Sequence, residues 1–165
     1  MSDNKQQVVI GIDLGGTAVK MGILNTSYEI LAQTSIPTDA QRPYEDIIGD
    51  IGRTAAALLT ENGYEISDCL GVGVGSPGTI DSKNGVVLYS NNIRWDHVPF
   101  SETLRKYLPI PVFIQNDANC MTLGEVLKGA ARGYQNAIFL TLGTGVGGGI
   151  VIDGKIFEGG HSGGA

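Results

Sequence analysis

The feature that most constrains the fold is the stretch Val8–Leu24, which reads VVIGIDLGGTAVKMGIL. Its opening run of Val and Ile predicts a buried strand. Gly15-Gly16 then interrupt the run with residues suited to a tight turn with positive φ, and alternating apolar residues from Val19 predict a returning strand. Bare amides in such a turn bind anions, and a carboxylate such as Asp13 can hold magnesium. We therefore predict a phosphate-binding hairpin, with an ordinary hairpin carrying an exposed Asp as the alternative.

The same pattern occurs a second time near the end of the sequence. Leu140–Ile152 reads LTLGTGVGGGIVI and aligns without a gap with Ile12–Leu24, IDLGGTAVKMGIL. In both stretches, a predicted strand leads to Leu-Gly and a turn of small residues, and a second apolar strand follows. Because internal repeats indicate related structural units, we predict two phosphate hairpins that face a shared cleft and clamp a nucleoside triphosphate.

Composition excludes several classes of protein. The 165 residues are 42% hydrophobic and 17% charged, as in a globular fold with a real core. A net charge of −6 argues against a nucleic-acid partner. No apolar run approaches the length of a membrane span, so we expect no membrane association and a cytoplasmic location. Cys69 and Cys120 fit reduced thiols of that compartment.

The order of strand and helix patterns predicts an α/β fold with a mixed sheet. After the hairpin, a third strand is expected over Glu29–Ile36 and a helix from Pro43 to Asn62-Gly63. Gly49 and Gly52 inside this helix suggest close packing on the sheet. The remaining expected elements are strands over Leu70–Val74, Val86–Tyr89, Val112–Ile114 and Ala137–Leu142, helices over Pro99–Leu108 and from Asn119 towards Gly133, and a polar loop over Ser90–Trp95.

Two familiar nucleotide motifs are excluded. Gly143, Gly145 and Gly148 fit G-x-G-x-x-G, but that fingerprint must open a helix and here a strand follows. No G-x-x-x-x-G-K-[ST] is present, which excludes a P-loop. His97 and His161 are isolated in loops and have no partner cysteines, so they do not predict a metal site.

Asp117 is the candidate catalytic residue. It ends an apolar strand, with Asn116 before it and Asn119 two residues later. Ligand chemistry in open α/β sheets collects at the carboxyl ends of strands, where a carboxylate could accept a hydroxyl proton. The alternative is that Asp117 is only the N-cap of the following helix, a position where Asp and Asn are favoured.

Four motifs in order resemble the ROK family of bacterial sugar kinases and sugar-responsive repressors, and most closely its glucokinase branch. They run through essentially the whole sequence. The motifs are Gly11-Ile12-Asp13-Leu14-Gly15-Gly16-Thr17, Gly75-Ser76-Pro77-Gly78, Asn116-Asp117-Ala118-Asn119, and Thr141-Leu142-Gly143-Thr144-Gly145-Val146-Gly147-Gly148-Gly149.

The resemblance implies the actin-like ATPase (ribonuclease H-like) fold, a mixed sheet with flanking helices. It implies a first domain over residues 1–117 and the start of a second over 118–165. Asp117 would be the catalytic base, and Asp13 would hold magnesium through water. The implied sugar-binding residues are Gly78, Asn91, Asn116 and Asp117. The implied ATP-binding residues are Asp13, Gly15, Gly16, Thr17, Lys20, Gly143, Thr144, Gly145 and Gly147.

The sequence departs from the family pattern at both ends. Only seven residues precede the first hairpin, too few for the DNA-binding helix-turn-helix of the family's repressors. Family members continue with a Gly-Glu-x-Gly-His segment, a cysteine-rich loop for structural zinc and a sugar-binding glutamate, none of which is present before Ala165. We therefore expect a piece of a longer protein or the product of a shortened gene. We expect these 165 residues to be inactive alone, with residues 1 to about 117 folded as the first domain. The sheet after Gly133 lacks covering helices, so we expect that segment to be poorly ordered or covered by another chain.

The resulting functional hypothesis is an ATP-dependent kinase that phosphorylates the 6-hydroxyl of a hexose, most simply glucose, and forms a homodimer at full length. Kinases of the same family for N-acetylmannosamine, N-acetylglucosamine, fructose or allose remain alternatives. A non-catalytic sugar-binding regulator is the alternative from another functional class.

Overall fold

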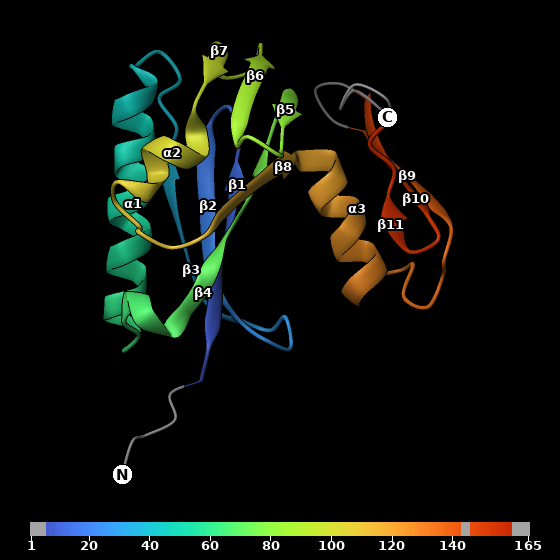
Figure 1. Ribbon diagram of the computed structural model, residues 1–165, viewed down its shortest axis with the longest axis horizontal. Coiled ribbons are helices and arrows are strands. Elements are labelled where there is room, and N and C mark those ends of the chain that lie inside the picture. The colour runs from blue at the N-terminus through green and yellow to red at the C-terminus, as the bar shows by residue number, and fades with distance from the viewer. Residues whose placement is uncertain (1–5, 143–145, 160–165) are drawn as a thin grey trace.

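The computed structural model describes residues 6–142 and 146–159, which form three sheets and three α-helices (Figure 1). The largest sheet has the strand order β3-β2-β1-β4-β8. Its strands are β1 (Val8–Leu14), β2 (Ala18–Asn25), β3 (Ile30–Pro37), β4 (Cys69–Ser76) and β8 (Val112–Asn116). β1, β2 and β3 pair antiparallel, whereas β4 and β8 extend the sheet parallel to β1. The mixed sheet predicted from the sequence is confirmed.

Alternating side chains of the five-stranded sheet form the core. Along β1, Val8, Ile10, Ile12 and Leu14 are all buried. This is the period-2 pattern of a strand with one face on the core. The buried apolar side chains of the other strands are Val19, Met21 and Ile23 on β2, Cys69, Val72 and Val74 on β4, and Val112 and Ile114 on β8. They pack against α1 (Tyr44–Glu61) and α2 (Phe100–Arg105), which lie together in Figure 1.

The two glycines inside α1, Gly49 and Gly52, allow a close contact with Tyr107 that was not predicted from the sequence. A Cβ on Gly52 would lie 2.4 Å from Cβ of Tyr107, and a Cβ on Gly49 would lie 2.9 Å from the Tyr107 hydroxyl. Tyr107 follows α2, so the close packing is between α1 and the α2 segment, and not between α1 and the sheet. The Arg53 guanidinium also lies 5.5 Å from the centre of the Tyr107 ring.

A second, three-stranded sheet has the order β5-β6-β7, with β5 (Thr79–Asp81), β6 (Val86–Ser90) and β7 (Trp95–Val98). Only β6 was expected, and the predicted polar loop ends where β7 begins. Trp95 is buried and its ring centre lies 6.1 Å from that of Phe100. This sheet therefore packs on the same core as α2.

Helix α3 (Asp117–Lys128) lies between the five-stranded sheet and a third sheet, β11-β10-β9 (Figure 1). The strands of this third sheet are β9 (Ala137–Leu142), β10 (Val146–Ile152) and β11 (Lys155–Ile156). α3 ends at Lys128, five residues before the predicted stop, because Gly129 and its neighbours fold into turns. One face of β9 and β10 carries exposed Ile138, Leu140, Leu142 and Val146, as expected for a sheet without covering helices. The described part of this segment nevertheless forms regular paired strands, which differs from the poorly ordered segment expected from the sequence. No described helix is both long and apolar enough to cross a membrane.

The Tyr107 contact predicts opposite effects for one substitution at two helical glycines. Gly52→Ala should destabilise the fold by about 1–3 kcal/mol, because the methyl group overpacks against Tyr107 and outweighs the better helix propensity of Ala. Gly124→Ala on α3 meets no atom within 4 Å and should stabilise the fold by up to about 1 kcal/mol. Urea denaturation of both variants measures the difference. Equal effects of the two substitutions would contradict the packing role of Gly52.

Candidate functional site

Three parallel strands end at one edge of the five-stranded sheet and bring the candidate residues together. In the pairing register, Asp13 of β1 lies beside Gly75 of β4, and Gly75 lies beside Gln115 of β8. One position further, Ser76 lies beside Asn116, which leads directly into α3. The sequence motifs that contain Asp13, Gly75 and Asn116 therefore meet at the strand ends, where α/β sheets bind ligands.

Asn116, not Asp117, caps helix α3. The Asn116 Oδ1 accepts hydrogen bonds from the Ala118 N–H (3.0 Å) and the Asn119 N–H (3.3 Å), as an N-cap side chain does. Asp117 is the first helical residue, and one of its oxygens, Oδ1, accepts the Ala118 N–H at 2.8 Å. The capping alternative for Asp117 is therefore wrong, and its second oxygen has no partner among the described residues.

The surroundings of Asp117 favour its protonated form. Partial burial raises the pKa of this carboxyl, the Ala118 N–H opposes the rise, and the negative charge of nearby Asp13 adds to it. Asp13 and Asp117 therefore interact across the strand ends. A carboxylate with a raised pKa is a better proton acceptor than an ordinary one, which suits a general base.

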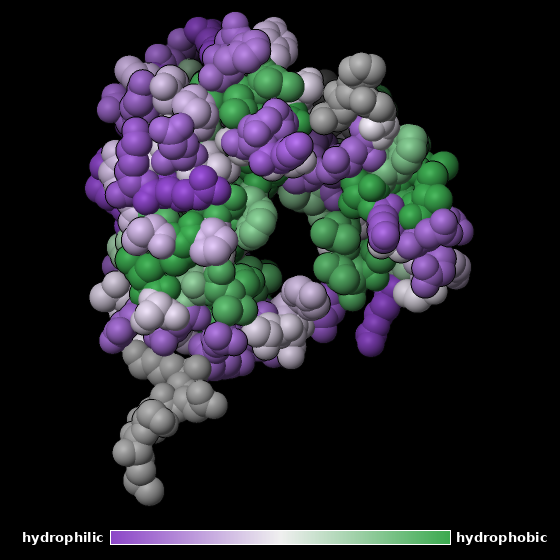
Figure 2. All heavy atoms as spheres, viewed as in Figure 1, coloured by the Kyte–Doolittle hydropathy of each residue, from purple (hydrophilic) through white to green (hydrophobic). Residues whose placement is uncertain are grey.

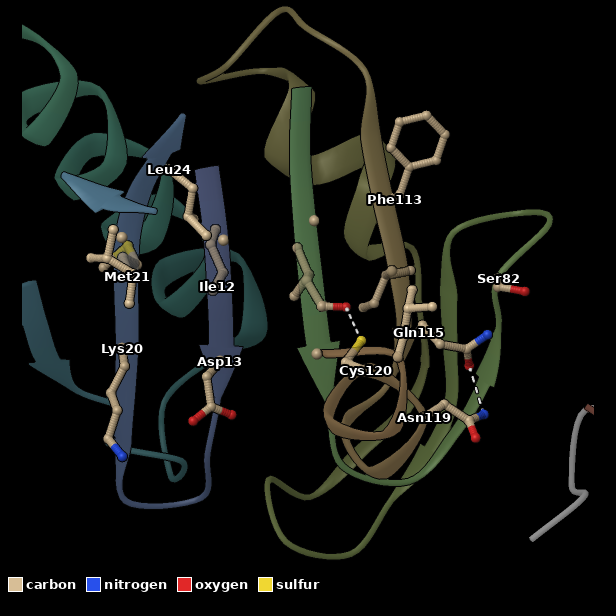
Figure 3. A pocket seen from close by; sticks show the side chains of 18 of the residues that line it. Ile12, Asp13, Lys20, Met21, Leu24, Ser82, Phe113, Gln115, Asn119 and Cys120 are labelled. Carbon is tan, nitrogen blue, oxygen red and sulfur yellow. Dashed lines mark hydrogen bonds between the residues drawn. The ribbon is translucent and has the colours of Figure 1, made fainter. Parts of the chain in front are cut away.

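Cys120 lies one turn further along α3 and is chemically quiet. Burial, with the charges of Asp117 and Asp13, raises the pKa of its thiol to about 11. The Sγ approaches the Val74 carbonyl oxygen at 3.9 Å (Figure 3). The thiol therefore stays neutral at physiological pH and serves packing rather than nucleophilic chemistry.

The predicted sugar residues Gly78 and Asn116 are in contact. The Asn116 Nδ2 donates to the Gly78 carbonyl at 3.1 Å, which leaves one amide N–H of Asn116 for a ligand. Gly78 has φ +105°, and a Cβ there would lie 2.1 Å from the Tyr89 carbonyl oxygen, so the position requires glycine. Ser90 also lies against Gly78, and the exposed Asn91 follows it in the chain.

The first hairpin is confirmed, but its glycines are not needed for positive φ. Neither Gly15 nor Gly16 is among the positive-φ residues of the described chain. A Cβ on Gly15 would instead lie 2.8 Å from the Ala18 oxygen, and one on Gly16 would lie 3.1 Å from the Asn92 oxygen. Close approach of backbone oxygens therefore explains both glycines. Thr17 and Gly16 are exposed at the tip of the turn.

A cavity of about 1290 Å³ lies over the sheet face opposite α1 and α2, and Figure 2 shows the hollow between this sheet and α3. Figure 3 shows Asp13 and Lys20 side by side on neighbouring strands of its wall, with Cys120 and Asn119 of α3 opposite them. Its floor is unusually bare, because Gly22, Gly11 and Gly73 form a row across β2, β1 and β4.

The second predicted hairpin is described only in part. Gly143, Thr144 and Gly145 lie outside the described residues. Gly147 on β10 pairs with Thr141, and a Cβ there would lie 3.6 Å from Cβ of Ala118. Strand β10 of this hairpin therefore lies beside Ala118 in the first turn of α3.

Two polar residues near these strand ends, Gln115 and Thr38, were not singled out from the sequence, whereas Asn119 was named there as part of a motif. Gln115 bonds the Asn116 N–H (2.7 Å), approaches Asn119 and contacts Glu158, which follows β11. The Asn119 Oδ1 is buried and has no described hydrogen-bond partner. Thr38 is fully buried beneath the first hairpin. Gln115 could have been recognised as a site residue from its position at the end of a strand. Nothing in the sequence indicates that Thr38 contacts the hairpin.

The acidic residues fit a metal that is bound largely through phosphates. In the described part of the chain, no three His, Cys, Asp or Glu side chains cluster to form a metal site. The exposed Asp13 beside the turn offers one carboxylate, and magnesium in nucleotide sites commonly uses one or two carboxylates together with phosphates and water. The expected zinc ligands are not among the residues of this sequence.

Comparison with known proteins gives one consistent result. A family model described as the ROK family matches residues 9–165. The glucokinases of Halalkalibacterium halodurans and Thermotoga maritima are 40% identical over 150 residues and 41% identical over 152, covering 91% and 92% of this chain. The chain spans about half the length of these relatives, 46% of each.

The structure is also similar to that of a ROK family glucokinase from Streptomyces griseus in complex with glucose and AMPPNP. The TM-score is 0.83 at 35% identity, and the match covers 94% of this chain and 47% of that one. The actin-like ATPase fold expected from the sequence is confirmed by this likeness.

The raised pKa of Asp117 predicts that its ionisation opposes folding. Asp117→Asn removes that charge and should raise the melting temperature of this chain at pH 7–8. The gain should shrink as the pH falls through the raised pKa and vanish below the ordinary carboxyl value of about 4, where Asp117 is protonated in both states. Thermal melts from pH 3.5 to 8 measure this.

Asp50→Asn is the control of opposite sign, because Arg42 and Arg53 lower the pKa of Asp50. It should lower the melting temperature at neutral pH, and this loss should persist down to about pH 4, because the stabilisation by ionised Asp50 fades only between the ordinary carboxyl value and the lowered pKa. If Asp117→Asn left the melting temperature at pH 8 unchanged or lowered it, the ionised Asp117 carboxylate would not destabilise the folded state.

Proposed function

Because this chain belongs to the ROK family, we propose that the whole protein is an ATP-dependent hexose kinase. It transfers the γ-phosphate of ATP to the 6-hydroxyl of glucose, with a related hexose of the same family as the alternative substrate. The names of the two relatives and the bound glucose and AMPPNP of the Streptomyces griseus structure support this choice. Because the chain spans about half of these proteins, the activity is proposed for the whole protein.

The observation that carries the proposal is the state of Asp117. Asn116 is the N-cap of α3. One oxygen of the Asp117 carboxylate therefore has no hydrogen-bond partner among the described residues, and it lies at the edge where three strands end. A residue needed only to begin a helix would make the capping bonds itself. A partly buried carboxylate with a raised pKa, beside the contact between Asn116 and Gly78, suits a base that receives a sugar proton.

In the proposed reaction, Asp117 accepts the proton of the sugar 6-hydroxyl as that oxygen attacks the γ-phosphorus. Gly78, Asn91 and Asn116 hold the sugar. The amides of the first turn and Lys20 hold phosphate oxygens, and Gly143, Thr144, Gly145 and Gly147 of the second hairpin supply further phosphate contacts. Magnesium, held through water by Asp13, supplies charge neutralisation when bound. Positioning and neutralisation account for most of the catalysis in phosphoryl transfer.

We further propose that the domain boundary lies at the start of α3, with residues 1–117 in the first domain and 118–165 opening the second. The full-length protein is a cytoplasmic homodimer of sugar metabolism with structural zinc in its second domain. The free cysteines Cys69 and Cys120 fit that compartment.

Asp117→Asn in the full-length protein should lower kcat by about 10²–10⁴ and leave glucose binding within a few-fold of the wild type. The amide keeps the size and the contact with the Ala118 N–H but cannot accept the hydroxyl proton. A coupled assay with ATP and a panel of hexoses measures kcat, and calorimetry measures glucose binding. Asp46→Asn, an exposed carboxylate on α1, is the matched control and should leave both unchanged.

The assay also tests the alternatives. Near-normal turnover by Asp117→Asn would remove Asp117 as the base while keeping the kinase. Sugar binding without turnover in the wild-type protein would overturn the kinase and favour a sugar-binding regulator.

The 165-residue chain alone is predicted to be inactive. In-line transfer needs donor and acceptor aligned at about 3–3.5 Å, and the apolar face of β9 and β10 is uncovered in this chain. The same coupled assay on the purified chain should give no sugar phosphate above background. Turnover at about 1–100 s⁻¹, typical of kinases, would contradict this prediction.

A further inference from the structure

Thr38 makes two hydrogen bonds to the turn of the first hairpin. It directly follows β3 and is fully buried. Its hydroxyl donates to the Gly15 carbonyl at 2.6 Å, and its backbone N–H donates to the Thr17 carbonyl at 2.9 Å. One residue therefore holds both carbonyls that flank Gly16, from a segment 23 residues away in the sequence.

These bonds fix the direction of the amides at the tip. In a planar trans peptide the C=O and the following N–H point in opposite directions. Because the Gly15 carbonyl points to the buried Thr38 hydroxyl, the Gly16 N–H must point away from Thr38, on the exposed side of the turn. Neither the Gly16 nor the Thr17 N–H donates to an acceptor among the described residues. Oriented, unused amides are what an anion-binding turn requires.

The same turn touches the loop that carries Asn91. Gly16 lies against the carbonyl of Asn92, where a Cβ would be crowded at 3.1 Å from the carbonyl oxygen. Arg94 of that loop donates to the Gln41 Oε1 at 2.7 Å, and Gln41 belongs to the segment that follows Thr38. The hairpin turn, the segment after Thr38 and the Asn91 loop are thus linked in a ring of contacts.

We propose that Thr38 is a positioning residue of the kinase: its hydroxyl sets the Gly16 amide for a nucleotide phosphate and, through the Gly16–Asn92 contact, steadies the loop that carries Asn91. This inference rests on the proposed function. Removing the hydroxyl leaves the Gly15 carbonyl without its buried donor, so the peptide group can turn and the amide loses its direction.

The test compares three variants of the full-length protein. Thr38→Val removes the hydroxyl at nearly constant size and should raise the KM for ATP about tenfold, with a smaller rise in the KM for glucose. Thr38→Ser keeps the donor and should stay within about twofold of the wild type for both. Thr60→Val removes an exposed hydroxyl that donates to the Ala56 carbonyl on α1, and should change neither KM.

Binding of AMPPNP with magnesium, followed by calorimetry, separates this inference from the proposed function. If wild-type protein phosphorylates no hexose, the function fails, but Thr38→Val should still weaken AMPPNP binding relative to Thr38→Ser. An unchanged KM for ATP and unchanged AMPPNP binding in Thr38→Val would overturn the positioning role, as would an equal loss in Thr38→Ser. If Thr38→Val does not fold, Thr38→Cys, whose thiol is a weaker donor, must weaken AMPPNP binding or the proposal fails.

Discussion

The parallel pairing of β1, β4 and β8 determines where each candidate group lies. Because the three strands run the same way, their carboxyl ends share one edge, with Asp13, Gly75 and Gln115 side by side. Gly75 is the central member. A Cβ built on it would lie 3.6 Å from the Asp117 Cα and 3.5 Å from the Cys120 Cβ, so the first turn of α3 lies directly on β4. That approach brings Asp117 within electrostatic reach of Asp13.

The site divides two tasks between adjacent residues. The Asn116 side chain accepts hydrogen bonds from the first N–H groups of α3, so Asp117 in the first turn is not needed as the cap. The positive end of a helix dipole favours an ionised carboxylate, whereas partial burial and the charge of Asp13 favour the protonated form. The proton affinity of Asp117 is therefore a balance of opposing influences from α3, β1 and the surrounding protein.

Local patterns were enough to predict the first hairpin, α1, the mixed sheet and the place of Asp117, since each depends on neighbouring residues. The short strands β5 and β7, of three and four residues, carry too little periodicity to be recognised. The reasons for the glycines were also hidden. Gly16 is crowded by Asn92 and Gly52 by Tyr107, contacts between segments far apart in the sequence. Thr38 was missed for the same reason, because its partner Gly15 lies across the fold.

The direct junction between β8 and α3 has a mechanical consequence. No linker separates Asn116 from Asp117, so the N-terminal end of α3, which carries the Asp117 carboxylate, is held by β8. With 12 residues at about 1.5 Å each, the helix is roughly 18 Å long. A tilt of about 10° at the junction would displace the Lys128 end, and the β9–β11 sheet packed along the helix, by about 3 Å. Asp117 would scarcely move. The candidate base thus lies at the β8–α3 junction, the point that a tilt of α3 relative to the five-stranded sheet would displace least.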